Sequence, residues 1–132
     1  MSGLAFRFEL RLEFDAAMRY DSLSGARGFV RLAGGAIEGP GLSVSLLPDG
    51  GDFGVHRRDG VEEFDGRYVG RTEDGVVLYV QNRGLVRDGR DCRCTPRFEV
   101  TPGRLDWLSR GLFVGVGERG GRSTTIRCFE VT

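Results

Sequence analysis

The sequence predicts an all-β protein, a small closed antiparallel β-barrel of about eight to ten strands. Residues 4–14 alternate apolar and charged side chains without a break, which is the period of a strand with one buried face. Short apolar runs recur along the rest of the chain, separated by turn pairs such as Asp59-Gly60 and Asp74-Gly75. Glycine makes up 22 of the 132 residues. Several glycines lie inside the runs, where they allow strands to bend and a barrel to close.

The N-terminal half divides at glycine-rich turns. In residues 4–14 leucine and phenylalanine occupy one face and arginine and glutamate the other, which favours an antiparallel sheet with one wet face. Residues 15–26 show no clear period and are expected to form a short helical turn or a loop. Strands are expected at 27–32, which Gly34-Gly35 follows, at 42–47, which Pro48-Asp49-Gly50-Gly51 ends, and at 53–57, which Asp59-Gly60 ends.

The C-terminal half continues as hairpins. Residues 61–72 form a long expected strand, in which the interior Gly66 and Gly70 predict a bend. An apolar, β-branched strand is expected at 76–82, followed by a polar loop at 83–91. The remaining strands are expected at 93–100, where Pro96 predicts an edge, a bulge or a strand start, and at 107–116 and 123–131, with a loop at 117–121.

The composition predicts one globular domain over residues 1–132. A chain of this length buries roughly two-thirds of its unfolded surface, so it can fold without disulfides. The 19 acidic side chains balance 19 basic ones, all of them arginine, so nucleic acid is not expected as a partner and lysine chemistry is excluded. No segment approaches the apolar length of a membrane span and the N-terminus is too charged for a signal peptide. The protein is therefore expected to be cytoplasmic, with no membrane partner.

A set of short motifs follows one order over nearly the whole chain. These are Gly34-Gly35, Gly39-Pro40, Leu47-Pro48-x-Gly50-Gly51-Asp52-Phe53, Arg57-x-Asp59-Gly60, Arg67-Tyr68, Thr72-x-Asp74-Gly75, Asn82-x-Gly84, Arg93-x-x-Pro96-Arg97-Phe98-Glu99, Trp107-Leu108 and Phe113-Val114-Gly115. Together they resemble the domain-of-unknown-function family numbered 3237, also called uncharacterised protein family 0311. The resemblance implies a compact antiparallel β-barrel and no agreed activity.

The chain departs from the pattern of that family at several positions. The family usually has Trp where Phe53 stands and Gly where Asp49 stands. It often has Asn where Ser109 stands, and an aromatic residue followed by Arg-Thr at positions 92–94, which are Cys-Arg-Cys here. A pocket formed by these positions is therefore expected to differ here in volume and polarity.

Four polar residues of the middle hairpins form the main candidate site. Asp52, Arg67 and Tyr68 are expected to be catalytic: a carboxylate whose pKa is raised by burial can act as a base, and a tyrosine hydroxyl can donate to developing charge. Asn82 and the arginine can hold a carboxylate, carbonyl or enolate oxygen. The alternative is a structural role, in which Asp52 caps a turn and pairs with Arg67. Which face of strand 61–72 points inward stays open.

Ligand-binding roles are also expected for Phe53, His56, Arg93 and Trp107. His56 is the only histidine and its imidazole titrates near neutral pH, although such a residue before a turn is more often solvated. Trp107 either lines a pocket or fills the core.

No metal site and no cofactor are expected. Cys92, Cys94 and Cys128 are an odd number of thiols, expected to be free, and the one-residue spacing of the first two is too short for an ordinary zinc site. The segment 115–120 spells a dinucleotide-binding fingerprint but lacks the helix that must follow it.

Two hypotheses about function remain open. The leading one is a small-molecule-binding barrel that performs a cofactor-free acid–base step, such as a cyclisation or isomerisation, on a small carbonyl or carboxylate compound. The alternative is a non-catalytic ligand carrier or interaction module, for which a homodimer through an exposed strand edge is one form.

Overall fold

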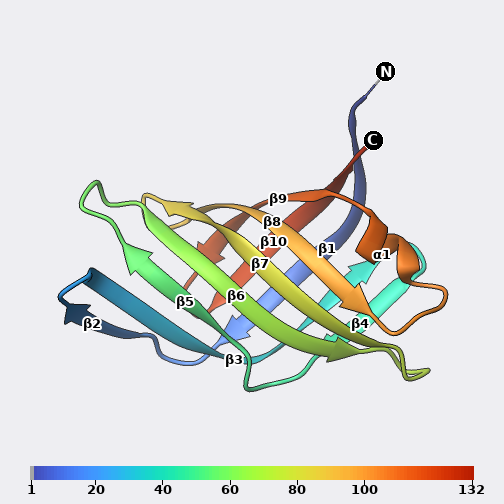
Figure 1. The fold of residues 1–132 in the computed structure, drawn as a ribbon, viewed down its shortest axis with the longest axis horizontal. Coiled ribbons are helices and arrows are strands. Elements are labelled where there is room, and N and C mark those ends of the chain that lie inside the picture. Colours follow the sequence, from blue (N-terminus) through green and yellow to red (C-terminus); the bar gives the residue numbers. More distant parts are fainter. Residues whose placement is uncertain (1) are drawn as a thin grey trace.

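The computed structural model describes residues 2–132, which form ten β-strands and one short helix (Figure 1). Every strand pairing among these residues is antiparallel. The elements are β1 (Leu4–Phe14), β2 (Met18–Ser22), β3 (Gly25–Gly39), β4 (Leu42–Leu46), β5 (Gly51–His56), β6 (Glu62–Arg71), β7 (Val77–Arg87), β8 (Asp91–Val100), α1 (Asp106–Arg110), β9 (Phe113–Gly120) and β10 (Ser123–Val131).

The strands close into a single barrel wall. The order β1-β10-β9-β8-β7-β6 leads round one side, and β6 then pairs with both β4 and β5. These two short strands follow one another along β3, which pairs in turn with β1 and so closes the ring. The wall therefore has eight strand places, with β4 and β5 sharing one. The expected closed antiparallel barrel is confirmed.

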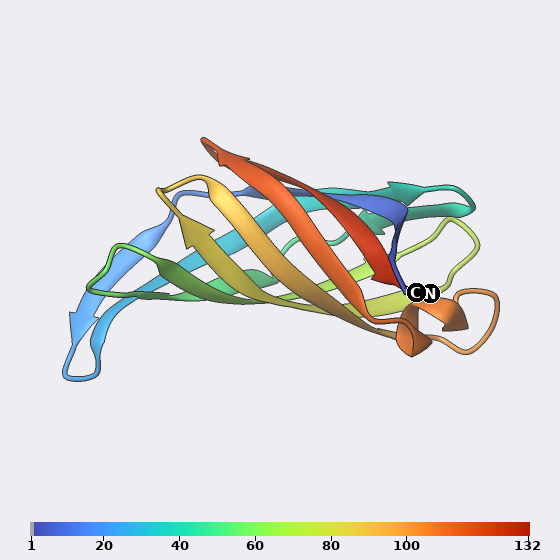
Figure 2. The same cartoon turned by 90° about the horizontal axis from the view of Figure 1, so that it is seen from above.

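Strand β2 leaves this wall and forms an arm with the start of β3 (Figure 2). Residues 15–17 separate it from β1, and all five residues of β2 are exposed. The arm projects from the end of the barrel opposite to α1 (Figures 1 and 2). This departure opens the wall between β1 and β2, which is where the candidate site lies.

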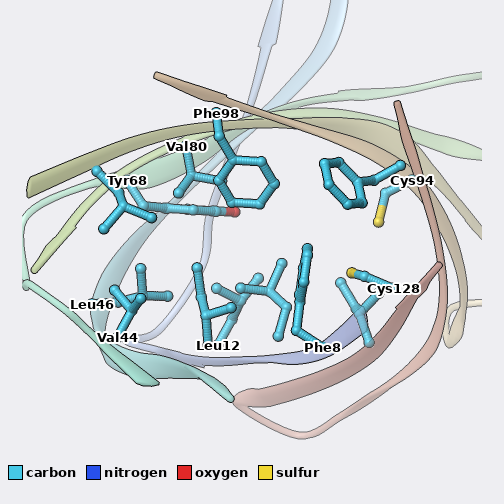
Figure 3. Close-up of a cluster of buried hydrophobic side chains, with 14 of the residues drawn as sticks. Phe8, Leu12, Val44, Leu46, Tyr68, Val80, Cys94, Phe98 and Cys128 are labelled. Atoms are coloured by element: carbon cyan, nitrogen blue, oxygen red, sulfur yellow. The ribbon is translucent and has the colours of Figure 1, made fainter. Parts of the chain in front are cut away.

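The alternation in β1 correctly predicts the buried side chains of its middle part, whereas Leu4 and Phe6 are 62% and 40% exposed, beside a register shift between Phe6 and Phe8. Phe8, Leu10 and Leu12 are buried. Phe8 and Leu12 point toward side chains of the opposite wall (Figure 3). The rings of Phe8, Phe98 and Phe113 pack with centroids 5.4 to 5.6 Å apart. Each such fully buried side chain stabilises the fold by roughly 1.5–3 kcal/mol.

Helix α1 closes the end of the barrel remote from the arm. Leu105 and Leu108 are buried there, and Trp107 packs edge-on against Phe113 with ring centroids 6.1 Å apart. The prediction of a strand at 107–116 is therefore wrong in its first part, because Asp106 accepts a hydrogen bond from the Gly103 amide and starts a turn of helix. Among residues 2–132 no helix is long and apolar enough to cross a bilayer.

Three expected loops are strands over much of their length in the structure. Residues 18–22 pair with β3, but both faces of β2 are exposed to solvent. The sequence of this strand therefore shows no apolar alternation from which it could be predicted. The polar segment 83–87 continues β7, and the turn that follows is short because Asp88 and Gly89 both adopt left-handed backbone angles. The expected loop at 117–121 is likewise mostly strand β9.

Candidate functional site

A cleft of about 290 Å³ opens into the barrel where the arm leaves the wall. We call it the mouth cleft; it is bounded by residues 14–19, by Gly28–Val30 of β3, by Asp52, Gly54 and His56 of β5, by Glu62 of β6, and by Arg119, Gly121 and Arg122 of the β9–β10 hairpin. A narrow extension of about 10 Å³, the inner chamber, continues into the core. The two spaces share Phe14, Asp52 and Arg119.

Asp52 and Tyr68 meet on the inner face of the wall. Asp52 on β5 is only 8% exposed, and Tyr68 on β6 lies with its oxygen directed into the interior (Figure 3). The Tyr68 hydroxyl donates a hydrogen bond to Asp52 Oδ1. Burial raises the pKa of Asp52 to about 6, although the Tyr68 hydrogen bond and the charge of Arg119 act to lower it.

Tyr68 itself remains protonated at neutral pH. Burial, followed by the negative charge of Asp52, raises its pKa well above the usual value of 10. The phenol is therefore a permanent donor to the carboxyl group, and the pair can exchange one proton with a ligand through Asp52.

Gly66 makes this contact possible. It lies directly opposite Asp52 in the β5–β6 ladder, with its own inner side facing the barrel. A Cβ atom at this position would overlap both the Tyr68 hydroxyl and Asp52 Oδ1. The glycine that the sequence suggested for strand bending therefore also provides the space in which the two polar groups meet.

Arg119 supplies the partly buried guanidinium of the site. It donates hydrogen bonds of 2.7 and 3.2 Å to the two carboxylate oxygens of Glu62, linking β9 to β6 across the mouth cleft. The charge of Arg119 lowers the pKa of Asp52, and that of Glu62 raises it. His56 lies beside the pair, with Nδ1 3.6 Å from Glu62 Oε1.

Asn82 projects into the inner chamber from β7 and is completely buried. It lies opposite Gly66 on one side and Pro96 on the other. Neither its Oδ1 nor its Nδ2 has a hydrogen-bond partner among residues 2–132. An unpaired buried polar group costs about 1–3 kcal/mol, so this amide is placed at the expense of stability.

The expected placement of Arg67 beside Asp52 is wrong. The alternation of β6 turns Tyr68 and Gly66 inward and Arg67 outward, where its Nη2 lies 3.3 Å from Asp65 Oδ2. The same alternation answers the question that the sequence left open about the inner face of this strand. The ion pair between Asp52 and Arg67, which the structural alternative required, therefore does not form.

Three further expected ligand contacts also lie outside the mouth cleft. Phe53 is 60% exposed on the outer face of β5 and packs on Phe29 with ring centroids 4.9 Å apart. Arg93 points outward from β8 and pairs with Asp91. Trp107 lies at the opposite end of the barrel on α1. Of the four additional residues, the structure places only His56 in the cleft.

Three residues of the site, Arg119, Glu62 and Thr124, were not predicted from the sequence. Arg119 falls in a segment expected to be a loop, yet it pairs with Thr124 in the β9–β10 ladder. The alternation of residues 123–131 carries the missing signal, since it places Thr124, Ile126 and Cys128 on the inner face. Extending that ladder backwards across the turn would have turned Arg119 inward as well.

The three cysteines are free and buried. Cys92 lines the inner chamber, and burial raises the pKa of the Cys128 thiol. No group of three or more His, Cys, Asp or Glu side chains within residues 2–132 is arranged to hold a metal ion. The glycine fingerprint at 115–120 lies in strand β9 and continues into β10 instead of a helix.

Comparison with known proteins finds relatives over most of the chain. An uncharacterised protein family 0311 member from Rhodopseudomonas palustris (strain TIE-1) is 30% identical over 125 residues, covering 82% of each chain. A member of the same family from Clostridium acetobutylicum is 24% identical over 129 residues, covering 85% of this chain and 82% of the relative.

Solved structures share the barrel. A conserved protein of unknown function from Rhodopseudomonas palustris superposes with a TM-score of 0.92 at 25% identity, covering 100% of this chain and 99% of the other. A β-barrel-like protein from Acinetobacter baumannii gives 0.89 at 22% identity, with 100% and 97% covered. A Penicillium herquei protein described as an enzyme gives 0.82 at 20% identity, with 99% and 95% covered.

The family described as protein of unknown function (DUF3237) matches residues 2–91 and 87–131, which together span almost the whole sequence. This match agrees with the ordered motifs and with the curated relatives. The chain belongs to this family.

Proposed function

We propose that the mouth cleft binds a small oxygen-bearing organic molecule and that Asp52 transfers a proton to and from it. The observation that carries this proposal is a carboxyl group with a pKa of about 6, buried but opening onto a cleft. A pKa near the working pH suits a group that must both accept and release a proton. In a barrel that is filled mainly by apolar side chains, a buried ionisable group lowers stability, and such groups are often found at functional sites.

The chemistry proposed for the site is a reversible proton transfer, in which the ligand loses one proton to Asp52 and regains one from it. The Asp52 carboxylate accepts a proton from a C–H or O–H group of the ligand and later gives it back at another atom. Isomerisation and ring closure by addition both balance in this way, without an oxidant or reductant. The Arg119 guanidinium lies close enough to stabilise negative charge that develops on a ligand oxygen.

The size of the cleft limits the ligand. At about 290 Å³ it lies at the lower end of the roughly 300–1,000 Å³ found for small-molecule sites. We therefore propose a ligand of about one ring. The Penicillium herquei protein that shares this fold is described as an enzyme, which supports the idea that such a barrel can accommodate catalysis.

A non-catalytic role remains the second candidate because of a separate surface. The outer face of the barrel beside the arm forms a broad depression of about 1090 Å³, into which Tyr20, Phe53, Leu85 and Val116 expose apolar side chains. Exposed apolar surface of this kind is typical of interaction sites. An interaction module, including a homodimer, would bind its partner through this face, and the mouth cleft would bind no ligand.

The two candidates are separated by an assay that requires no knowledge of the natural product. Small cyclic ketones, phenols and aromatic acids are first screened for a rise in melting temperature, since a ligand that binds only the native state stabilises it. Compounds that bind are then incubated with the protein in D₂O, and proton exchange is followed by NMR. Catalysis by Asp52 predicts exchange that falls about 10²–10⁴-fold in Asp52→Asn.

The matched control is Asp65→Asn, which alters a carboxylate on the outer face of β6. Exchange in this variant should match that of the unaltered protein. Binding without exchange, or exchange that survives in Asp52→Asn, would refute the catalytic proposal and favour a carrier.

A further inference from the structure

The inner chamber is a space for one atom, set in an apolar core. Its volume of about 10 Å³ is close to the smallest that holds a single water molecule. Leu12, Phe64, Val86 and Ile126 form apolar parts of its lining, and Asn82, Asp52, Cys92, Thr124 and Arg119 contribute polar groups. A chamber of this size at the end of an open cleft can receive only the tip of a ligand.

The Asn82 amide determines which chemical group of a ligand can enter the inner chamber. Its NH₂ group lacks an acceptor and its oxygen lacks a donor among residues 2–132, although the side chain is fully buried. The backbone of β7 is paired on both sides, so the side chain cannot reach solvent without breaking the wall. Both needs are met only by a group that accepts one hydrogen bond and donates another.

Few chemical groups meet both needs in the space of one atom. Carbonyl and ether oxygens accept without donating, and methyl or halogen groups leave the amide unpaired. Carboxylic acids and primary amides do both, but with two heteroatoms spread over a planar group that one-atom space excludes. A hydroxyl group accepts and donates through one oxygen.

We infer that the inner chamber is a hydroxyl subsite formed by Asn82. In the ligand-free protein it holds one water molecule, and in the complex it holds the hydroxyl oxygen of an alcohol, enol or phenol. This inference rests on the proposed binding of a small molecule in the mouth cleft and narrows its class to hydroxylated compounds. Because Phe14, Asp52 and Arg119 border both spaces, the carbon that bears the hydroxyl lies beside the Asp52 carboxyl group.

Phenol and fluorobenzene are suitable probes, because they share one ring and differ in the group that would enter the chamber. Their affinities are measured by NMR titration at pH 7, following the resonances of Phe14 and Met18 in the mouth cleft. A site built to pair with a hydroxyl rejects an analogue that lacks it, so phenol should bind at least about tenfold more tightly than fluorobenzene. In Asn82→Leu most of this preference should be lost, because neither polar atom of Asn82 remains to pair with the hydroxyl group and only the other polar groups of the chamber can still contact it.

The matched control is Gln81→Leu, which makes the same change one residue earlier, on the opposite side of β7. It should keep the preference for phenol. If Asn82→Leu does not give a folded spectrum, Asn82→Ala removes the same two groups with less bulk. In the ligand-free protein, nuclear Overhauser effects should connect a long-lived water to the Asn82 NH₂ protons.

The outcomes separate this inference from the proposed function. If phenol and fluorobenzene shift the cleft resonances with equal affinity, or if the preference for phenol survives in the Asn82 variants, the hydroxyl subsite is refuted while ligand binding in the cleft stands. If neither compound binds, both are refuted. Absence of the water contact in a protein that prefers phenol would refute the ligand-free part of the inference.

Discussion

At the scale of single residues, Asp52 makes stability depend on pH. Its folded-state pKa of about 6 exceeds the ordinary value of 3.8 because burial disfavours the charged form. Between these pH values the folded state binds more protons than the unfolded state, so the free energy of unfolding falls as pH rises from about 4 to about 6. The shift corresponds to about 3 kcal/mol above that window.

Asp52→Asn should therefore stabilise the protein at pH 8 by up to about 3 kcal/mol and have little effect at pH 3.5, where the carboxyl group is neutral in the folded state and mostly neutral in the unfolded state. The asparagine oxygen can still accept the hydrogen bond of Tyr68. Urea unfolding curves at the two pH values measure the difference. Equal effects of the substitution at both values would show that the Asp52 pKa is not raised in the folded protein.

Single residues also show which parts of the site could be predicted from the sequence and which could not. Asp52, Tyr68 and Asn82 were predicted because polar residues in apolar strand runs need a reason, and the structure brings all three into one region. Arg67 was predicted beside Asp52 and Arg119 was not predicted. Neighbours in a strand face opposite sides, so Arg67 and Tyr68 cannot both point into the barrel.

At the scale of elements, the inner face of β6 requires glycine at position 66, because Tyr68 and Asp52 meet in the space that a side chain would fill. Gly66→Ala would place a Cβ atom into the Tyr68–Asp52 contact, so these two buried side-chain ends would have to separate. Such overpacking typically costs about 1–3 kcal/mol. The carboxyl titration of Asp52, followed by ¹³C NMR, should change at the same time because its hydrogen bond is displaced.

Gly34→Ala is the matched control on β3, where the nearest atom to an added Cβ is 3.9 Å away. It should leave both the stability and the Asp52 titration close to those of the unaltered protein. Equal destabilisation by the two substitutions would mean that glycine is required for strand bending alone.

The link between β6 and β9 tunes Asp52 from both sides. Arg119 lowers the pKa of the carboxyl group and Glu62 raises it. Arg119→Met should therefore raise the Asp52 pKa above about 6, and Glu62→Gln should lower it, as measured by the same titration. Shifts in the same direction for both variants would show that the charges act by rearranging the cleft instead of through space.

Elements were predictable where the wall has two different faces. β1 was located residue for residue because its inner side is apolar and its outer side charged. β2 was missed because the arm is exposed on all sides, and the end of β7 because outward arginines look like a loop. Periodicity carries information only when burial differs between the two faces of a strand.

At the scale of the whole molecule, closure joins distant parts of the chain. β1 pairs with both β10 and β3, so the wall is complete only when the C-terminal strand has docked. Glycine content and close turns predicted a barrel, but neither the strand that closes it nor the shared place of β4 and β5 can be obtained from local patterns. Those features depend on the registers of all the strand pairs around the barrel taken together.

The prediction of a single domain is tested by cooperativity. Far-UV circular dichroism reports the strands, and the fluorescence of Trp107, the only tryptophan, reports the closed end of the barrel. A single domain predicts coincident urea transitions by the two probes. Separate midpoints would indicate that the two ends of the barrel unfold independently.

The buried side chains of Leu105, Leu108 and Phe113 close the α1 end of the barrel and so restrict how a ligand could reach Asp52. With that end sealed, a ligand that binds beside Asp52 under the proposed function would enter and leave through the same mouth cleft. A product that still occupies the cleft would then compete with the substrate for binding, and competitive product inhibition is the expected result.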